Sequence, residues 1–225
     1  MKKLFLPGFI FFFFTTSLSA QRTEVIRVKG NDVPAFIAKT KYKFPAFTHA
    51  KIFLKNGEVA SARINFDYFD QAVKYIGEQR DTLILTNDDI KYISSTVDTF
   101  FYDKKFYEWI ASSATARLAM LRTYKLNDKQ KIGAFGTSSP TQKIESHDAI
   151  LGVTHLDLGT NEEYVFSEQT SYFISKTDGN FVPATKKNIS KIFPKKDIEN
   201  YIASNKLNIN KQEDLITLFV YANKL

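Results

Sequence analysis

Two of the three histidines in this 225-residue chain stand close to acidic residues, in a pattern that could support acid–base or metal chemistry. His147 is followed by Asp148, and His155 precedes Asp157 by two positions. An imidazole near a carboxylate can transfer protons or bind a transition metal, so these four residues are a candidate polar site. The alternative, that they are solvated residues of an irregular loop, is favoured. We therefore assign no catalytic residue and no metal ligand, and we expect no bound cofactor.

Other carboxylates fall at predicted turns, and cysteine is missing from the chain. An Asp in a turn hydrogen-bonds its own backbone, which accounts for Asp67, Asp70, Asp88 and Asp89 without a calcium site or a glycosidase pair. The lack of cysteine excludes disulfides, zinc–thiolate sites, thiol nucleophiles and the lipidated cysteine of a lipoprotein. Glycine-rich phosphate loops, nucleophile elbows and H-E-x-x-H zinc motifs are also missing. These residues leave open whether the chain is an enzyme, with a non-enzyme favoured.

Aromatic residues supply the second candidate site. Two strands joined at Asp103-Lys104 would place rings on both faces of one hairpin. One face would then join the core, and the other would be free to stack on sugars or dock a protein. The alternative is that the C-terminal helices cover this second face and complete another core layer. The candidate binding surface comprises Phe100, Tyr102, Tyr107 and Trp109.

These rings belong to a stretch, residues 51–110, that predicts an antiparallel β-meander. Short runs of alternating apolar and polar residues follow each other closely and are separated by turn residues. Asn56-Gly57 is a strong hairpin signal, because both residues tolerate the positive φ of a type I′ turn. Aromatic residues make up 15% of the chain, and rings favour strands.

Residues 1–20 predict a targeting signal rather than part of the fold. Lys2 and Lys3 precede an apolar run over residues 4–14, and small and polar residues lead to an expected cleavage site after Ala20. The apolar run is shorter than the ~20 residues of a transmembrane helix. We therefore expect a periplasmic or extracellular protein that is not a lipoprotein and has no transmembrane segment once the signal is removed.

The segments beside the meander complete a β domain that we expect to span residues 21–184. Residues 24–28 and 35–44 predict two strands before the meander. Residues 112–126 are compatible with a helix or a strand, and a strand is favoured. An irregular loop is expected at about 127–158.

Residues 185–225 predict a helical segment packed on the sheet. Thr185 can cap a short first helix, and Pro194 separates it from a second. Asn210 and Glu213 have the spacing of a capping box before the last helix, whose apolar residues recur on one face. We expect this apolar stripe to dock on the aromatic meander.

Two resemblances extend this interpretation. The run from Leu54 to Val59, followed by a run ending at Asp67, is similar to the hairpin and long bent strand of small SH3-like barrels of the Sm type. That similarity implies local strand geometry alone, since the RNA-binding residues of those barrels are not matched, and we expect no nucleic-acid partner. The second resemblance rests on Ser-Ala-Gln21, the meander with Asn56-Gly57, the Gly-Ala-Phe-Gly136 loop and the C-terminal tail. With these features the chain resembles, along most of its length, a family of secreted, β-rich Gram-negative bacterial proteins, and that resemblance implies no activity.

Together these features predict a mainly β protein with C-terminal helices. An antiparallel meander would form a curved sheet or barrel-like core, covered by two or three short helices. The leading functional hypothesis is a non-catalytic exported envelope protein that binds a protein or glycan partner or supports a surface assembly. One alternative is a hydrolase of envelope polymers that uses the region of His147 and His155. Another is a carrier that holds a small apolar ligand in a cavity.

Overall fold

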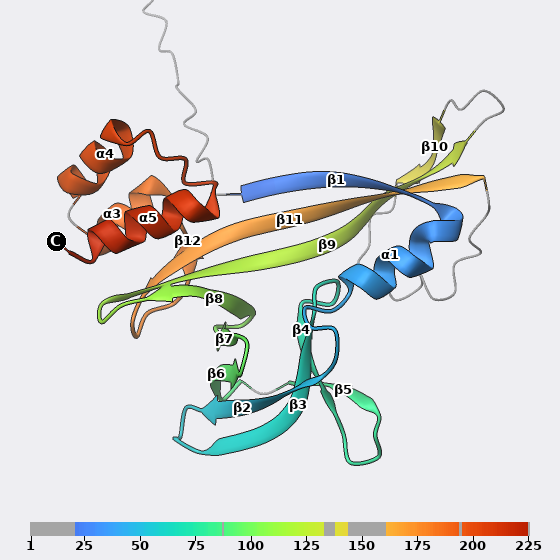
Figure 1. The fold of residues 1–225 in the computed structure, drawn as a ribbon, viewed down its shortest axis with the longest axis horizontal. Helices are drawn as coiled ribbons and strands as arrows, with labels where there is room; N and C mark the ends of the chain where they lie inside the picture. The colour runs from blue at the N-terminus through green and yellow to red at the C-terminus, as the bar shows by residue number, and fades with distance from the viewer. Residues whose placement is uncertain (1–20, 87, 133–137, 144–160, 194, 225) are drawn as a thin grey trace, which may run out of the picture.

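The chain folds around one antiparallel sheet (Figure 1), and the computed structural model describes residues 21–86, 88–132, 138–143, 161–193 and 195–224. Ten strands follow each other in the order β1-β11-β9-β8-β7-β6-β2-β3-β4-β5, while β10 pairs with β9 and β12 with β11. Three helices follow the last strand, so the fold is mainly β with C-terminal helices, as the sequence predicts. Within the described ranges, no helix combines the length and apolarity needed to cross a membrane.

The strands differ widely in length. Their bounds are β1 Gln21–Lys29, β2 Thr48–Leu54, β3 Val59–Asp67, β4 Ala72–Ile76, β5 Thr82–Ile84, β6 Ile90–Ser95, β7 Thr99–Tyr102, β8 Phe106–Ser112, β9 Ala116–Ile132, β10 Ser138–Lys143, β11 Glu162–Lys176 and β12 Val182–Pro183. The helices are short. Their bounds are η1 Gly30–Asp32 (a 3-10 turn), α1 Val33–Thr40, α3 Lys186–Ile192, α4 Lys195–Ser204 and α5 Gln212–Ala222.

Three long strands form a band that crosses the molecule (Figure 1). β9 and β11 pair from Ala116 opposite Lys176 to Lys131 opposite Glu162, and β1 runs along the other edge of β11. The helices α3, α4 and α5 lie at one end of the band and α1 at the other. The predicted strand after the meander is thus confirmed, and it continues into the predicted loop. Most of the rest of that loop lies outside the described residues.

The meander itself comprises β2 to β8. Its first hairpin turns at Gly57, whose φ of 92° is a left-handed conformation that glycine adopts without a steric penalty. Asn56 does not have a positive φ, so the expected type I′ turn is wrong, although the hairpin itself is present. β3 then runs to Asp67. β6 returns to pair with β2 on the side away from β3, so β5 and β6 are consecutive in the chain but are not neighbours in the sheet.

One face of the long band carries two separate hydrophobic cores. The first core lies beneath the meander and α1 and includes the fully buried Ile64, Phe100 and Phe166. The second core lies beneath the C-terminal helices and includes Leu118 and Leu218. The helices therefore cover one end of the β9–β11 band, together with Ile110 and Ala111 of β8, and the aromatic rings of the hairpin are not part of this core.

Val33–Thr40 is a helix, although the sequence predicted a strand over residues 35–44. Pro34 lies in the first turn of α1, where its missing N–H breaks no hydrogen bond and its fixed φ suits the helix. The alternation that favoured a strand belongs to the residues after the helix. There, Tyr42 forms an isolated bridge with Asp67.

The C-terminal helices begin in different ways. Thr185 caps α3, because its hydroxyl oxygen accepts a hydrogen bond from the backbone N–H of Asn188 at 3.2 Å. The predicted capping box before α5 is wrong. The N-cap is Lys211, which makes no side-chain cap bond, and the Asn210 side-chain oxygen accepts from the backbone N–H of Gln21 at 3.2 Å.

Candidate functional site

The four aromatic candidates do not form one surface. Phe100 is fully buried in the first core, and Tyr107 is buried beneath Phe181, with ring centroids 4.7 Å apart. Tyr102 is half-buried, and Trp109 is 43% exposed. The second face of the hairpin is thus covered by a ring from the β11–β12 connection, and the helices do not cover it.

The polar candidates His147, Asp148, His155 and Asp157 lie outside the described residues. Among the residues that the structure does describe, no group of three His, Asp or Glu side chains is placed to hold a metal ion.

A polar band separates the two cores on the inner face of the long strands. It consists of two neighbouring cross-strand rows: Arg22, Thr170 and Arg122 form the first, and Glu24, Glu168 and Tyr124 the second. On either side the rows become apolar, with Met120 opposite Tyr172 towards the second core and Leu126 opposite Phe166 towards the first. Charged side chains therefore occupy positions that share a strand face with core residues.

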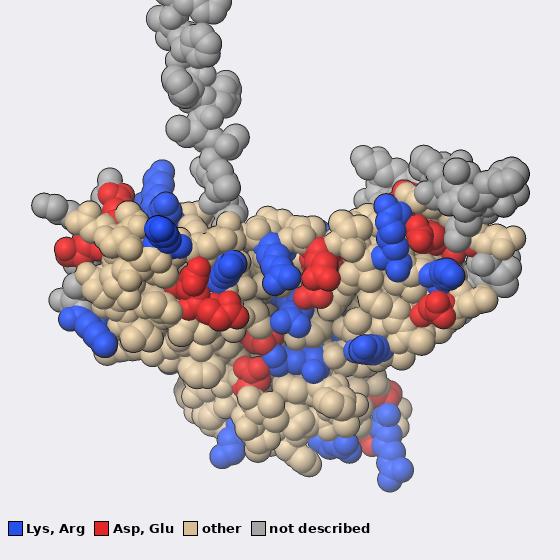
Figure 2. Space-filling view, turned by 45° about the horizontal axis from the view of Figure 1, so that its top comes forward, with Lys and Arg blue, Asp and Glu red and all other residues tan. Residues whose placement is uncertain are grey.

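All residues of these rows except Tyr124 line a cleft of about 380 Å³ that reaches the start of α5. Asn210, Lys211, Gln212 and Glu213 contribute from the helical side. The first N–H groups of a helix have no intrahelical acceptor, and here no N-cap side chain supplies one. Figure 2 shows basic and acidic side chains side by side across the middle of the molecule, between its helical end and its other end.

Arg122 is the central cation of the cleft. Its Nε lies 3.5 Å from Glu168 Oε1, and its guanidinium carbon lies 5.6 Å from the centre of the Tyr68 ring. Nε is shielded from solvent, whereas the side chain as a whole is 35% exposed and lines the cleft. Burial alone would lower the pKa of Arg122, but Tyr68, Glu168 and Glu108 together raise it, so the guanidinium stays charged.

Glu168 is held between two donors. The Tyr124 hydroxyl donates to Glu168 Oε2 at 2.7 Å, and Arg122 pairs with the other oxygen. Burial, together with the hydrogen bond and the negative charge of Glu168, raises the pKa of Tyr124, so the phenol keeps its proton. The carboxylate is thus fixed as an acceptor that orients Arg122.

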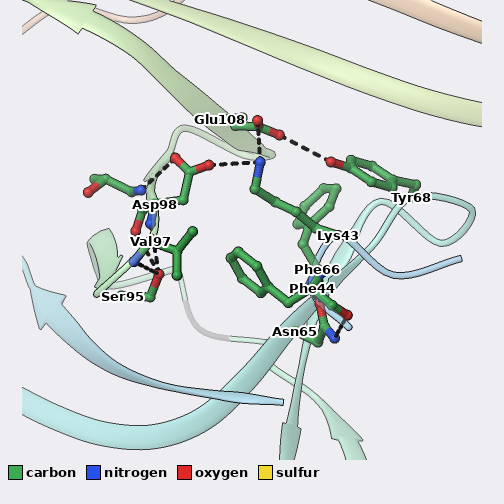
Figure 3. Close-up of polar contacts among 10 residues, drawn as sticks. Lys43, Phe44, Asn65, Phe66, Tyr68, Ser95, Val97, Asp98 and Glu108 are labelled. Carbon is green, nitrogen blue, oxygen red and sulfur yellow. Dashed lines mark hydrogen bonds and ion pairs between the residues drawn. The ribbon is translucent and has the colours of Figure 1, made fainter. Parts of the chain in front are cut away.

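A buried polar group lies on the meander side of Tyr68 (Figure 3). Lys43 Nζ lies 2.7 Å from Asp98 Oδ2 and also contacts Glu108 Oε1, and the Lys43 side chain is only 13% exposed. The Tyr68 hydroxyl donates to Glu108 Oε2 at 3.4 Å. Tyr68 therefore connects the two groups, because its hydroxyl bonds to Glu108 while its ring lies beneath Arg122.

The cleft carries equal numbers of opposite charges. Its cations are Arg22, Arg122 and Lys211, and its carboxylates are Glu24, Glu168 and Glu213. A simple anion would gain little binding energy in this cleft, because the nearby carboxylates repel it while the cations attract it. A ligand with both a carboxylate and an ammonium group can satisfy both signs, with the guanidinium offering paired N–H donors to the carboxylate.

The sequence analysis did not identify this cleft, although a signal was present. In β9, Arg122 stands in phase with Met120 and Tyr124, where the β pattern calls for a core residue. In β11, Glu168 and Thr170 interrupt the apolar positions of the same face. Polar residues in phase with a buried strand face were the available sign of a site.

Comparison of the chain with models of known families, with curated proteins and with solved structures gives no match.

Proposed function

We propose that this protein is an exported, non-catalytic binding protein whose cleft holds an amino acid or a short peptide by its free carboxylate and free ammonium groups. The observation that carries this proposal is the pair of polar rows between the two cores, centred on Arg122. A guanidinium held by Glu168 and Tyr68 loses little conformational freedom when a ligand carboxylate arrives. Glu24, which forms an exposed ion pair with Arg22 at 3.8 Å, and Glu213 also line the cleft and would bind the ammonium group.

The chemistry of the cleft supports binding rather than proton transfer. Glu168 already accepts hydrogen bonds or ion pairs from Tyr124 and Arg122, and the Tyr124 phenol has a raised pKa. A general acid or base must exchange its proton near the working pH. The Tyr124 phenol, beside the cleft, keeps its proton instead, and Glu168 is engaged by two partners, which suits electrostatic recognition.

Export is part of the same proposal. The leader over residues 1–20 supports it, and the expected cleavage after Ala20 leaves the whole of β1 in the mature chain. N-terminal sequencing of exported protein should then begin at Gln21. Exported material that still begins at Met1 would contradict the proposed processing.

Calorimetric titration with glycine, diglycine and triglycine tests the ligand class, because the series varies the distance between the two charged ends. At least one member should bind, and its N-acetylated and C-amidated forms should bind much more weakly. Arg122→Gln should lower the affinity about tenfold or more, since a charge-assisted hydrogen bond contributes about 1.5–3 kcal/mol. Glu24→Gln should weaken binding of the ammonium end. It should leave the stability of the fold unchanged, because Glu24 is exposed.

Lys125→Gln is the matched control for Arg122→Gln. Lys125 is an exposed cation on the same strand, at a position that alternates to the other face. Its substitution should leave the affinity unchanged. The proposal fails if no member of the series binds, if blocking either end has no effect, or if Arg122→Gln and Lys125→Gln bind equally well.

A further inference from the structure

The outer face of the meander carries a row of aromatic rings that the first core does not use. Phe53, Tyr92, Phe101 and Tyr107 stand opposite one another across β2, β6, β7 and β8. They alternate along their strands with core residues such as Phe100 and therefore face away from the first core. Phe53 and Tyr92 stack with centroids 4.3 Å apart.

This row ends in a groove of about 390 Å³ where the β7–β8 turn meets the β11–β12 turn. The two turns are bonded together, since the backbone N–H of Phe181 donates to Asp103 Oδ2 at 2.8 Å. The Phe181 ring lies 4.7 Å from that of Tyr107 and 5.8 Å from that of Phe101. The aromatic wall of the groove is thus fixed on both sides.

Cations outnumber acids along this groove. Its charged residues are Lys55, Lys91, Lys104 and Arg117 against Asp88 and Asp103. Both acids already accept hydrogen bonds, Asp88 from the Tyr102 hydroxyl at 2.8 Å and Asp103 from Phe181. Within the described part of the chain, Lys91, Lys104 and Arg117 form no ion pair with a carboxylate.

Arg117 lies across the aromatic wall, with its guanidinium carbon 5.0 Å from the centre of the Phe101 ring. A cation on a ring face is held in place by the ring quadrupole and still presents its N–H groups outwards. The groove therefore combines flat rings with uncompensated positive charge, and this combination suits a ligand with a ring body and a negative group.

We propose that this groove binds an acidic polysaccharide, with a sugar ring against Phe101 and Phe181 and its carboxylate near Lys91, Lys104 and Arg117. Three considerations favour a saccharide over a nucleic acid. The leader predicts export, lysine ammonium groups tolerate carboxylates at varied positions, and a single arginine gives little of the forked geometry that phosphate recognition uses. This site lies on the opposite face of the sheet from the cleft between the cores, and its ligand is independent of the cleft ligand.

The test uses the mature protein and a hexameric oligogalacturonate, with the fully methyl-esterified hexamer as a neutral probe of the same ring structure. Calorimetry at low salt should detect binding of the acidic hexamer. The ester should bind at least about tenfold more weakly. Added sodium chloride should weaken binding of the acidic form alone, because salt screens exposed charges.

Three variants locate the site. The double change Lys91→Gln with Lys104→Gln should reduce the affinity for the acidic hexamer to that for the ester. Phe181→Leu keeps apolar volume but removes the flat ring, and it should weaken both probes by the same factor. Lys29→Gln, at an exposed position at the end of β1, should change neither.

An unchanged circular dichroism spectrum and thermal midpoint would verify that each variant is folded. The proposal is overturned if the acidic hexamer does not bind, if the ester binds as well, or if the double variant binds like the parent. Tighter binding of a single-stranded oligothymidylate of equal length would also overturn it and would assign the groove to a nucleic acid.

Discussion

The two cores of this protein lie on the same strands but are built from different side chains. The first core is rich in aromatic rings, such as Phe66 stacked on Phe100 at 5.3 Å and Phe69 on Tyr124 at 5.4 Å. The second is mostly aliphatic and receives its Leu and Ile residues largely from the C-terminal helices. A bent meander leaves a wide interior that rings can span, whereas short helices on a strand band need compact branched side chains. The polar band lies between the two cores, and Tyr124 belongs both to the band and to the edge of the first core.

Removing a ring from the first core should have the largest effect. Phe100→Ala deletes a fully buried ring that contacts Phe44 and Phe66, and Phe→Ala changes in cores cost about 3–5 kcal/mol. Because whole-domain stability is about 5–15 kcal/mol, the urea midpoint should fall sharply. A midpoint like that of the parent would mean that the rings of the first core contribute little to stability.

Removing a branched side chain from the second core should lower the free energy of unfolding somewhat less than removing a ring from the first. Leu218→Ala truncates a buried residue of α5 and should lower the stability by about 3 kcal/mol. Val220→Ala is the matched control on the same helix, since Val220 is 49% exposed, and it should have little effect. Phe219→Ala should resemble Leu218→Ala.

The same variants show whether the cores are coupled. β9 and β11 supply residues to both, so Phe100→Ala and Leu218→Ala should each shift one cooperative unfolding transition. Two separate transitions, or an unchanged melting temperature after truncation following Asn210, would make the second core independent. The apolar face of α5 would then be a surface for another protein.

Alkaline pH should affect the first core more than the second. Burial, together with the neighbouring Glu108, raises the pKa of Tyr68, so the folded chain keeps a proton that the unfolded chain releases above about pH 10. This contribution to stability is fully present below pH 10 and is lost as the pH rises further. Tyr68→Phe should therefore reduce the fall in urea midpoint between pH 9 and pH 11. Tyr172→Phe, in the second core, should reduce it less.

The smallest expected effect concerns the helix starts of the second core. Thr185→Ala removes the cap of α3 and should cost about 1 kcal/mol, measured by thermal unfolding. Lys211→Ser adds a capping side chain where α5 has none and should stabilise by a similar amount or less. A loss of stability with Lys211→Ser would indicate that Lys211 makes a contact more valuable than a cap.

Local signals explain how much of this fold could be predicted. Alternation and the Asn56-Gly57 turn predicted the meander, because a half-buried strand and a tight hairpin each leave a clear pattern in a few residues. The α1 helix was missed because Pro34 is compatible with the start of either a strand or a helix. The capping box failed because Asn210 bonds to Gln21, a partner that no local spacing predicts.

Long-range pairing explains what could not be predicted. The C-terminal helices were expected on the aromatic meander, but they cover Leu118 and Ile174 on the long strands, and no local pattern states which strands meet which helices. The cleft depends on the same long-range register. Arg22, Thr170 and Arg122 form one row only once three distant strands are aligned, so the sequence showed isolated charges and not a site.

The pairing of β1 with β11 also bears on the order of folding. Gln21 pairs with Ser171, so the first described strand cannot pair until β11, one of the last strands, is present. Both cores also include residues of β11. Pairing across such a sequence separation is slow, because much chain entropy is lost before any contact forms. A chain that leaves the cytoplasm with its N-terminus first has neither core complete until β11 has followed. In the export that we propose, this topology would keep the polypeptide unfolded during threading.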